Sequence, residues 1–168
     1  MNNSPYSDSF LKWAAMAGYV LSFEDGAWVL GNIGGEILYC LRLSNGVYTV
    51  TQVERGVSQG FEIACPDIKD VERHMAWWLS IVIRSQRHLP FMYCAFKVDD
   101  IRPGWSVVKS DGVWILYTPS GEERARFGGD HAVVFSWIAD LDVDEMYRSF
   151  LDPDGSPLFS GCWIGPPR

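Results

Sequence analysis

Histidine and cysteine are the residue types in this chain that most readily support metal binding or nucleophilic catalysis. The chain has three histidines, His74, His88 and His131, and four cysteines. None of them forms a CxxC pair or the HxH, HExxH or HxxxH spacings with which a local segment binds zinc. A nucleophilic pair such as Cys94 with His88 or His131 stays open, because such partners meet only in the fold. The spacing therefore predicts no metal, no cofactor and no local catalytic motif.

Paired carboxylates and glycine-rich segments are the other patterns that could do chemistry. Asp99-Asp100 and Glu122-Glu123 are adjacent, and neighbours on a strand point to opposite faces, so neither pair makes a two-acid site.

GNIGGE (31–36) is superficially like a dinucleotide-binding loop, but the alternating ILYCLRL after it predicts a strand instead of the phosphate-binding helix. We interpret it as an exposed turn that could enter a partner's cleft, and we expect no small-molecule substrate.

The charge of the chain excludes several classes of partner. The formal net charge is −7, so nucleic acid and anionic membranes, which bind basic surfaces, are poor partners. Acidic residues concentrate between Asp140 and Asp154, which predicts either a solvated helix face or a docking surface for a basic partner. MNNSPYSDSFLKW at the N-terminus lacks a signal-peptide pattern, and no apolar run is long enough to span a membrane. We therefore expect a cytoplasmic protein with free, mostly buried thiols.

Turn dipeptides mark the elements that must position these residues. Strand-like runs of alternating hydrophobicity flank Asp-Gly at 25–26 and 111–112 and Asn-Gly at 45–46. Both residues of a type I′ turn need positive φ, which these dipeptides tolerate, so each predicts a hairpin. ERGVSQG (54–60) is interpreted as a simple connection.

The longest expected helix spans residues 67–85 and contains HMAWWLSIVIRS (74–85). Its apolar stripe includes Val71, Met75 and Trp78, and the part after residue 73 is apolar nearly all round, which is typical of a buried helix. We therefore predict that this is the central core helix and that its tryptophans fill volume instead of lining a pocket.

Shorter helices are expected near residues 8–17, 131–139 and 143–151, with a second group of strands within 104–127. Meanders followed by helices occur twice, and no linker or low-complexity segment divides them. The sequence predicts one α+β domain over residues 1–168. In it, antiparallel β-hairpins and meanders pack on a central buried helix, with short N-terminal and C-terminal helices.

Six segments follow, in order, the pattern of a known family. They are AGYVLS (17–22), GGEILYCL (34–41), ERG (54–56), DVERHM (70–75), IRSQRHLP (83–90) and SFLDPDGSPLF (149–159). On these segments the chain resembles the actinobacterial immunity-protein-61 family over nearly its whole length. The resemblance implies a cytosolic antitoxin without catalysis of its own, which binds a secreted NAD(P)+ glycohydrolase toxin domain and occludes its NAD site.

Two other functions stay open: a SUKH-type immunity or adaptor module for another toxin, and a small enzyme with a Cys/His or carboxylate cleft. An inhibitor of an NAD site benefits from a protruding loop with glycines and carboxylates, because that cleft is electropositive and glycine allows close backbone approach. The toxin-interface candidates are the first-ranked loop with Gly34, Gly35 and Glu36, the hairpin tip with Glu24 and Asp25, and the turn with Glu122 and Glu123. A flat aromatic face elsewhere is the alternative interface.

Overall fold

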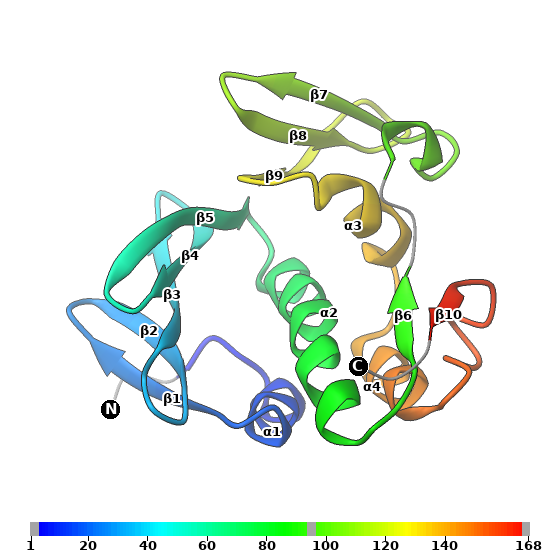
Figure 1. Ribbon diagram of the computed structural model, residues 1–168. Coiled ribbons are helices and arrows are strands. Elements are labelled where there is room, and N and C mark those ends of the chain that lie inside the picture. Colours follow the sequence, from blue (N-terminus) through cyan, green and yellow to red (C-terminus); the bar gives the residue numbers. More distant parts are fainter. Residues whose placement is uncertain (1–3, 94–96, 166–168) are drawn as a thin grey trace.

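The expected hairpins join into one antiparallel sheet of eight strands (Figure 1). The computed structural model describes residues 4–93 and 97–165. In the sheet the strands follow the order β1-β2-β3-β4-β5-β9-β8-β7. Their bounds are β1 Tyr19–Glu24, β2 Ala27–Asn32, β3 Ile37–Ser44, β4 Val47–Glu54, β5 Val57–Cys65, β7 Ser106–Ser110, β8 Val113–Tyr117 and β9 Glu123–Phe127. Two short strands that the sequence did not predict, β6 (Phe91–Tyr93) and β10 (Trp163–Gly165), pair separately.

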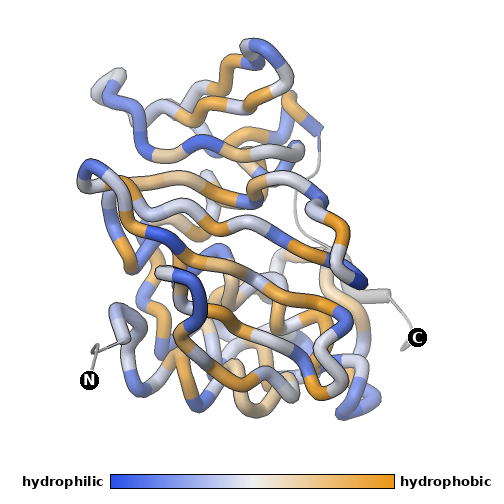
Figure 2. Tube along the Cα trace, turned by 90° about the vertical axis from the view of Figure 1, so that its left-hand side faces the viewer, coloured by the Kyte–Doolittle hydropathy of each residue, from blue (hydrophilic) through white to orange (hydrophobic). Residues whose placement is uncertain are grey.

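The helices cover one face of this sheet and leave the other open. Figure 2, which looks onto the open face, shows the strands in front and the helices behind them. The helices of the described residues are α1 (Asp8–Met16), α2 (Ile68–Gln86), α3 (Ala132–Ile138) and α4 (Val143–Leu151), with a 3-10 turn at Val98–Asp100. The prediction of an α+β fold with antiparallel sheet, a central helix and short terminal helices is confirmed.

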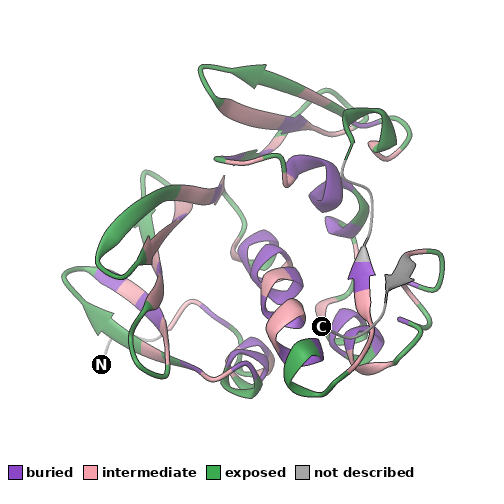
Figure 3. Cartoon of the chain, viewed as in Figure 1, coloured by how far each residue is buried: buried purple, intermediate pink, exposed green. Residues whose placement is uncertain are grey.

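Two-residue turns of the predicted kind connect the hairpins. Asp-Gly at 25–26 and 111–112 and Asn-Gly at 45–46 have positive φ at both positions, as type I′ geometry requires. Arg55 and Gly56 also have positive φ, 49° and 78°, and join β4 to β5 in the same way. The segment interpreted as a simple connection is therefore a fourth hairpin of this kind. Figure 3 shows that the hairpin tips are exposed.

A row of apolar side chains crosses the sheet and packs under the helices. Leu41 pairs with Val50, Val50 with Ile63 and Ile63 with Phe127, and all four are fully buried. On α2 the matching stripe is Val71, Met75, Leu79 and Ile83, each at most 1% exposed and spaced at i, i+4. The central helix therefore packs on β4 and β5, while α3 packs on β8 and β9 of the second half.

The adjacent tryptophans of α2 have different roles. Trp77 is 8% exposed and packs edge-on against Phe150 and Phe159, with ring centroids 5.9 and 6.2 Å away. Trp78 is only partly buried and lines a cavity. Trp77 fills volume as predicted, but it borders the same cavity as Trp78, so the prediction that these tryptophans do not line a pocket is wrong for both.

The two halves of the sheet meet at a short seam. Strands β5 and β9 pair only through Ile63 with Phe127 and Ala64 with Arg126. Beside this seam the carboxylate of Asp70, which is 1% exposed, accepts hydrogen bonds from Arg124 Nη2 and Arg73 Nη1, both at 2.9 Å. Arg124 Nε also lies 2.6 Å from this carboxylate, as an ion pair. Burial raises the pKa of Asp70, and the hydrogen bond from Arg124 opposes that shift. Two strand pairs and a mostly buried ion triad thus connect the two halves at the seam.

Arg84 fixes the other end of α2. Its guanidinium is 2% exposed and donates to four backbone carbonyls. The acceptors are those of Pro90, Phe150, Asp152 and Pro153, at 2.7 to 2.9 Å. Carbonyl oxygens satisfy the donors of a buried cation, so this residue ties the central helix to the end of α4.

The cysteines correct one expectation. Cys40 and Cys65 are free, and burial raises the pKa of the Cys65 thiol to about 12. Cys162 is disulfide-bonded, so the expectation of free thiols throughout is wrong, and the cytoplasmic assignment loses that support. Cys94, the example given for a nucleophilic pair that the sequence leaves open, lies outside the described residues. Within the described ranges no helix is long and apolar enough to cross a membrane.

Candidate functional site: a histidine and carboxylate pocket at the seam

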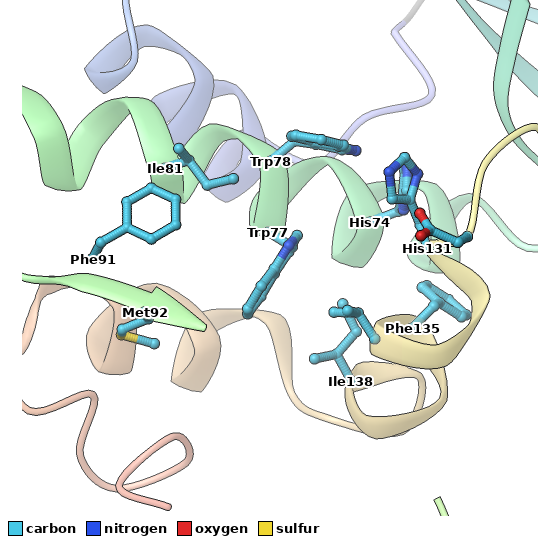
Figure 4. A pocket seen from close by; sticks show the side chains of 11 residues that line it. His74, Trp77, Trp78, Ile81, Phe91, Met92, His131, Phe135 and Ile138 are labelled. Carbon is cyan, nitrogen blue, oxygen red and sulfur yellow. The ribbon is translucent and has the colours of Figure 1, made fainter. Parts of the chain in front are cut away.

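A cavity of about 300 Å³ lies between α2, α3 and β6 (Figure 4). Figure 4 shows Trp77 and Trp78 projecting from α2, with His74 and His131 side by side at one end of the cavity. Phe91 from β6 borders the opposite end. The stretch HMAWWLSIVIRS is therefore both the central helix and one wall of a pocket, two interpretations that the sequence analysis treated as alternatives.

A carboxylate lies between the two histidines. Glu62 Oε2 is 3.9 Å from His74 Nε2 and 3.8 Å from His131 Nδ1. These distances exceed hydrogen-bond length, and neither ring nitrogen has a hydrogen-bond partner within the described chain. The side chains of His74, Glu62 and His131 are 2%, 13% and 29% exposed, so the cluster is mostly shielded from water. Three groups that can bind a cation or a proton thus share one small space.

A bulge in β5 presents Glu62 to this space. Val50 pairs with Ile63 and Thr51 with Phe61, which leaves Glu62 as an extra residue without a partner on β4. Such a bulge re-aims a side chain and is frequent beside functional sites. The alternation of a regular strand does not predict the orientation of Glu62, and the sequence analysis did not select it.

The glycines before α3 place His131. A Cβ at Gly128 would overlap the carbonyl oxygen of Phe61, so only glycine lets this turn lie against the bulged strand. A Cβ at Gly129 would stand 3.2 Å from Cε1 of His131 and press on its ring. The segment GGDH (128–131) is therefore the element that brings His131 next to Glu62.

The surroundings of His74 favour its neutral form. Burial lowers the pKa of His74, and the nearby carboxylate of Glu62 opposes that shift. The indole of Trp78 meets the ring of His131 edge-on at 4.9 Å, which fixes the orientation of that ring. The described lining residues include no serine, threonine or cysteine.

The first-ranked interface candidate lies on an exposed turn between β2 and β3 and is not part of the lining of this cavity. Gly34 and Gly35 have φ of 104° and 69°, and Glu36 pairs with Arg55 of the neighbouring turn at 3.7 Å. Asn32 fixes the base of the loop: its side chain accepts from Ile37 N and its carbonyl from Gly35 N, both at 2.8 Å. Beside it, Ile33 is 84% exposed, an apolar residue that the sequence analysis missed.

The other two candidate segments lie at the opposite end of the strands. Consecutive turns of an antiparallel meander alternate between its ends, so the tip with Glu24 and Asp25 is opposite the Gly34 turn. The register of β9 on β5 places the turn with Glu122 and Glu123 at that same opposite end. All of these residues are exposed. The structure therefore does not bring the three segments together on one surface.

The carboxylates at that opposite end differ in pairing. Glu123 accepts from Arg126 Nε at 2.7 Å and Nη2 at 2.9 Å, and this contact lowers the pKa of Glu123. Glu24, Asp25 and Glu122 form no ion pair with any described residue. Their charges are therefore available to a partner, whereas that of Glu123 is largely neutralised.

Much of the acidic segment 140–154 has structural roles. Asp142 caps α4 by accepting from Glu145 N, and the carboxylate of Asp152 accepts from the backbone of residues 154 and 156. Asp140 pairs with Arg102 at 2.8 Å on the rim of a wider groove. Capping and turn formation explain these acids without a basic partner.

The comparisons with known proteins decide the family. Residues 13–158 match the sequence family described as Immunity protein 61. The chain belongs to the immunity protein 61 family. Membership confirms the resemblance carried by the six sequence segments and favours it over a SUKH-type module.

Relatives of this immunity protein agree in name and in fold. It is 29% identical over 141 residues to "Immunity factor for TNT" of Mycobacterium tuberculosis (strain ATCC 25618 / H37Rv), which covers 82% of this chain and 80% of the relative. The same values hold for the "Immunity factor for TNT homolog" of Mycobacterium bovis (strain BCG / Pasteur 1173P2). The structure of Rv3902c from M. tuberculosis is similar, with a TM-score of 0.83, 27% identity and coverage of 92% of this chain and 93% of that chain.

Proposed function

We propose that this immunity protein binds the NAD(P)+ glycohydrolase domain of a secreted toxin and blocks its NAD site, without catalysis of its own. The observation that carries the proposal is the family match together with similarity, over four-fifths of the chain, to immunity factors for TNT. Cellular NAD is the substrate that needs protection, so we place the protein in the cytoplasm of the producing cell.

For the contact surface we propose the loop Ile33–Glu36. Ile33 offers an apolar anchor that is 84% exposed, and a Cβ at Gly34 or Gly35 would meet nothing within 4 Å. An exposed apolar residue beside a bare backbone can enter a narrow cleft and exclude water from it. Because Asn32 fixes the base of the loop, little conformational entropy is lost on binding.

Charge supports the same loop. The pyrophosphate of NAD requires a cleft of positive potential, and the immunity protein carries a net charge of −7. Glu36 is 61% exposed, and its 3.7 Å pair with Arg55 is a weak surface contact that a toxin cation can replace. Glu36 would therefore occupy the position of a phosphate, with Ile33 anchoring beside it.

The test is inhibition of NAD hydrolysis by the toxin domain, titrated with wild type, Ile33→Asp and Glu36→Lys. We expect stoichiometric inhibition by wild type and a loss of at least about 30-fold in affinity for each variant, as expected for contact residues worth about 2 kcal/mol. Asp25→Lys, which makes the same kind of charge reversal at the opposite end of the sheet, is the control and should stay within about 3-fold of wild type.

The outcomes separate the two parts of the proposal. If wild type binds no toxin domain or leaves NAD hydrolysis unchanged, the function is wrong. If wild type inhibits and both loop variants inhibit equally well, the interface assignment is wrong and the function stands. A loss confined to Asp25→Lys would move the interface to the opposite end of the sheet.

A further inference from the structure

We propose that Glu62, His74 and His131 form a binding site for one divalent transition-metal ion, with zinc as the best fit. The site is separate from the proposed toxin interface. It contradicts the prediction of no metal that the spacing of histidines and cysteines gave. Its ligands come from β5, from α2 and from the turn before α3, at positions 62, 74 and 131.

The ligand set and its geometry support this assignment. Two imidazole nitrogens and one carboxylate oxygen lie within 4.8 Å of one another. Tetrahedral zinc with bonds of about 2.1 Å places its ligand atoms about 3.4 Å apart. Glu62 lies 3.8 and 3.9 Å from the two imidazole nitrogens, and all three ligand atoms lie within 4.8 Å of one another, so side-chain rotation must bring them closer together on metal binding. Calcium and magnesium prefer all-oxygen sites and fit this set poorly.

Burial supplies the second, independent observation. His74 is 2% exposed, and its Nε2 points at Glu62 from a distance too long for a hydrogen bond. An unpaired polar atom in such a place costs about 1–3 kcal/mol, so a partner that satisfies it is favoured. A metal ion would satisfy His74, His131 and Glu62 at once. A single bridging water is the competing occupant, and the test distinguishes the two.

The surroundings leave room for a fourth ligand. Both histidines line the 300 Å³ cavity, and so does the exposed carboxylate of Asp130. Three fixed protein ligands beside a cavity leave one coordination position for water, for Asp130 or for a small anion. The bulge at Glu62 and the close approach of Gly128 to Phe61 hold the ligands on backbone that is already in place.

The experiment uses untagged, full-length protein that has been treated with chelator and then titrated with Zn²⁺ by calorimetry and metal analysis. We expect one ion per chain and a thermal midpoint that rises with zinc concentration, because an ion that binds only the folded state stabilises it. The same titration with Mg²⁺ should give no binding. Substoichiometric zinc, or zinc binding that leaves the midpoint unchanged, would overturn the proposal in favour of the bridging water.

Matched variants identify the ligands. His131→Asn and Glu62→Gln should each weaken zinc binding by at least about 100-fold. Their chelator-treated forms should remain folded, because both side chains are partly exposed. His88→Asn, at an exposed histidine with φ of 55°, is the control and should bind zinc as wild type does. Equal binding by all three variants would exclude the site.

Cobalt gives a readout that cysteine ligands cannot imitate. Co²⁺ bound by two imidazoles and a carboxylate should give tetrahedral ligand-field bands without the intense thiolate charge-transfer band of a cysteine site. A thiolate band, or loss of binding when the free Cys65 is replaced by alanine, would assign the metal to cysteine and contradict the proposal.

Discussion

The meander β1–β5 and the seam between β5 and β9 are built on different principles. In the meander each strand pairs with the next one along the chain through a tight turn, and the tips are exposed. At the seam two residue pairs join the strands, and buried charges and histidines from distant segments complete the contact. The two regions therefore face different demands. The exposed turns can vary to fit a partner, while the buried polar and charged groups at the seam need partners within the chain.

This comparison predicts where substitutions are costly. Along the meander, the polar groups at the turns keep access to water when a contact is lost. At the seam, a lost contact leaves a charged or polar atom buried without a partner, which costs more than the contact itself contributed. Three matched pairs of substitutions test the comparison, from the largest expected effect to the smallest.

The adjacent tryptophans of α2 test whether one of them stabilises the core more than the other. Trp77→Ala should lower the free energy of unfolding by about 3–5 kcal/mol, because it opens a cavity against Phe150 and Phe159. Trp78→Ala should cost only about 1–2 kcal/mol, since its side chain is partly exposed and already borders a cavity. Urea unfolding measures both, and equal losses would contradict this division of α2.

Two ion pairs, one mostly buried at the seam and one exposed in the meander, test the comparison directly. Asp70→Asn should cost about 3 kcal/mol, the low end for breaking a buried pair, because Arg124 is 30% exposed. In the meander, Glu36→Gln removes the exposed pair with Arg55 and should change stability by less than about 0.5 kcal/mol. The corresponding fall in thermal midpoint for Asp70→Asn is about 6–12 °C. Similar midpoints for the two variants would remove the distinction between seam and meander.

Two glycines test the close approach that positions His131. Gly128→Ala should cost about 1–3 kcal/mol, because its Cβ meets the carbonyl oxygen of Phe61 and the turn must shift. Gly161→Ala is the control, since a Cβ there meets nothing within 4 Å. Chemical denaturation gives both values. If the two substitutions cost the same, the turn before α3 has more room than the structure shows.

The sequence predicts the meander well because its information is local. Asp-Gly and Asn-Gly at 25–26 and 45–46 determine the turns through backbone conformation alone, and the alternation beside them assigns the inner face. Helix α4 was predicted with its observed bounds for the same reason, since Asp142 caps it and its period is regular. Such signals lie within a few residues of the structure that they specify.

The contacts at the seam cannot be predicted from local sequence patterns, because the residues that meet there are far apart along the chain. Asp70 meets Arg124, and Glu62 meets His131, only after β9 has docked on β5. A bulge breaks the alternation at Glu62, so strand periodicity gives the wrong expectation for its side chain. The interface candidates could be proposed from composition. Only the strand order shows that Gly34 and Glu122 lie at opposite ends of the sheet.

Hydrogen–deuterium exchange of the protein alone and with an equimolar toxin domain tests the central claim, that the exposed turns serve the partner and the seam serves the fold. We predict slower exchange at residues 33–36 and 55–56 in the complex, because these turns are neighbours in the sheet. Exchange at 25–26, at 118–122 and along α2 should be unchanged. Protection confined to 25–26 and 118–122, or to the walls of the cavity between α2 and α3, would contradict the account.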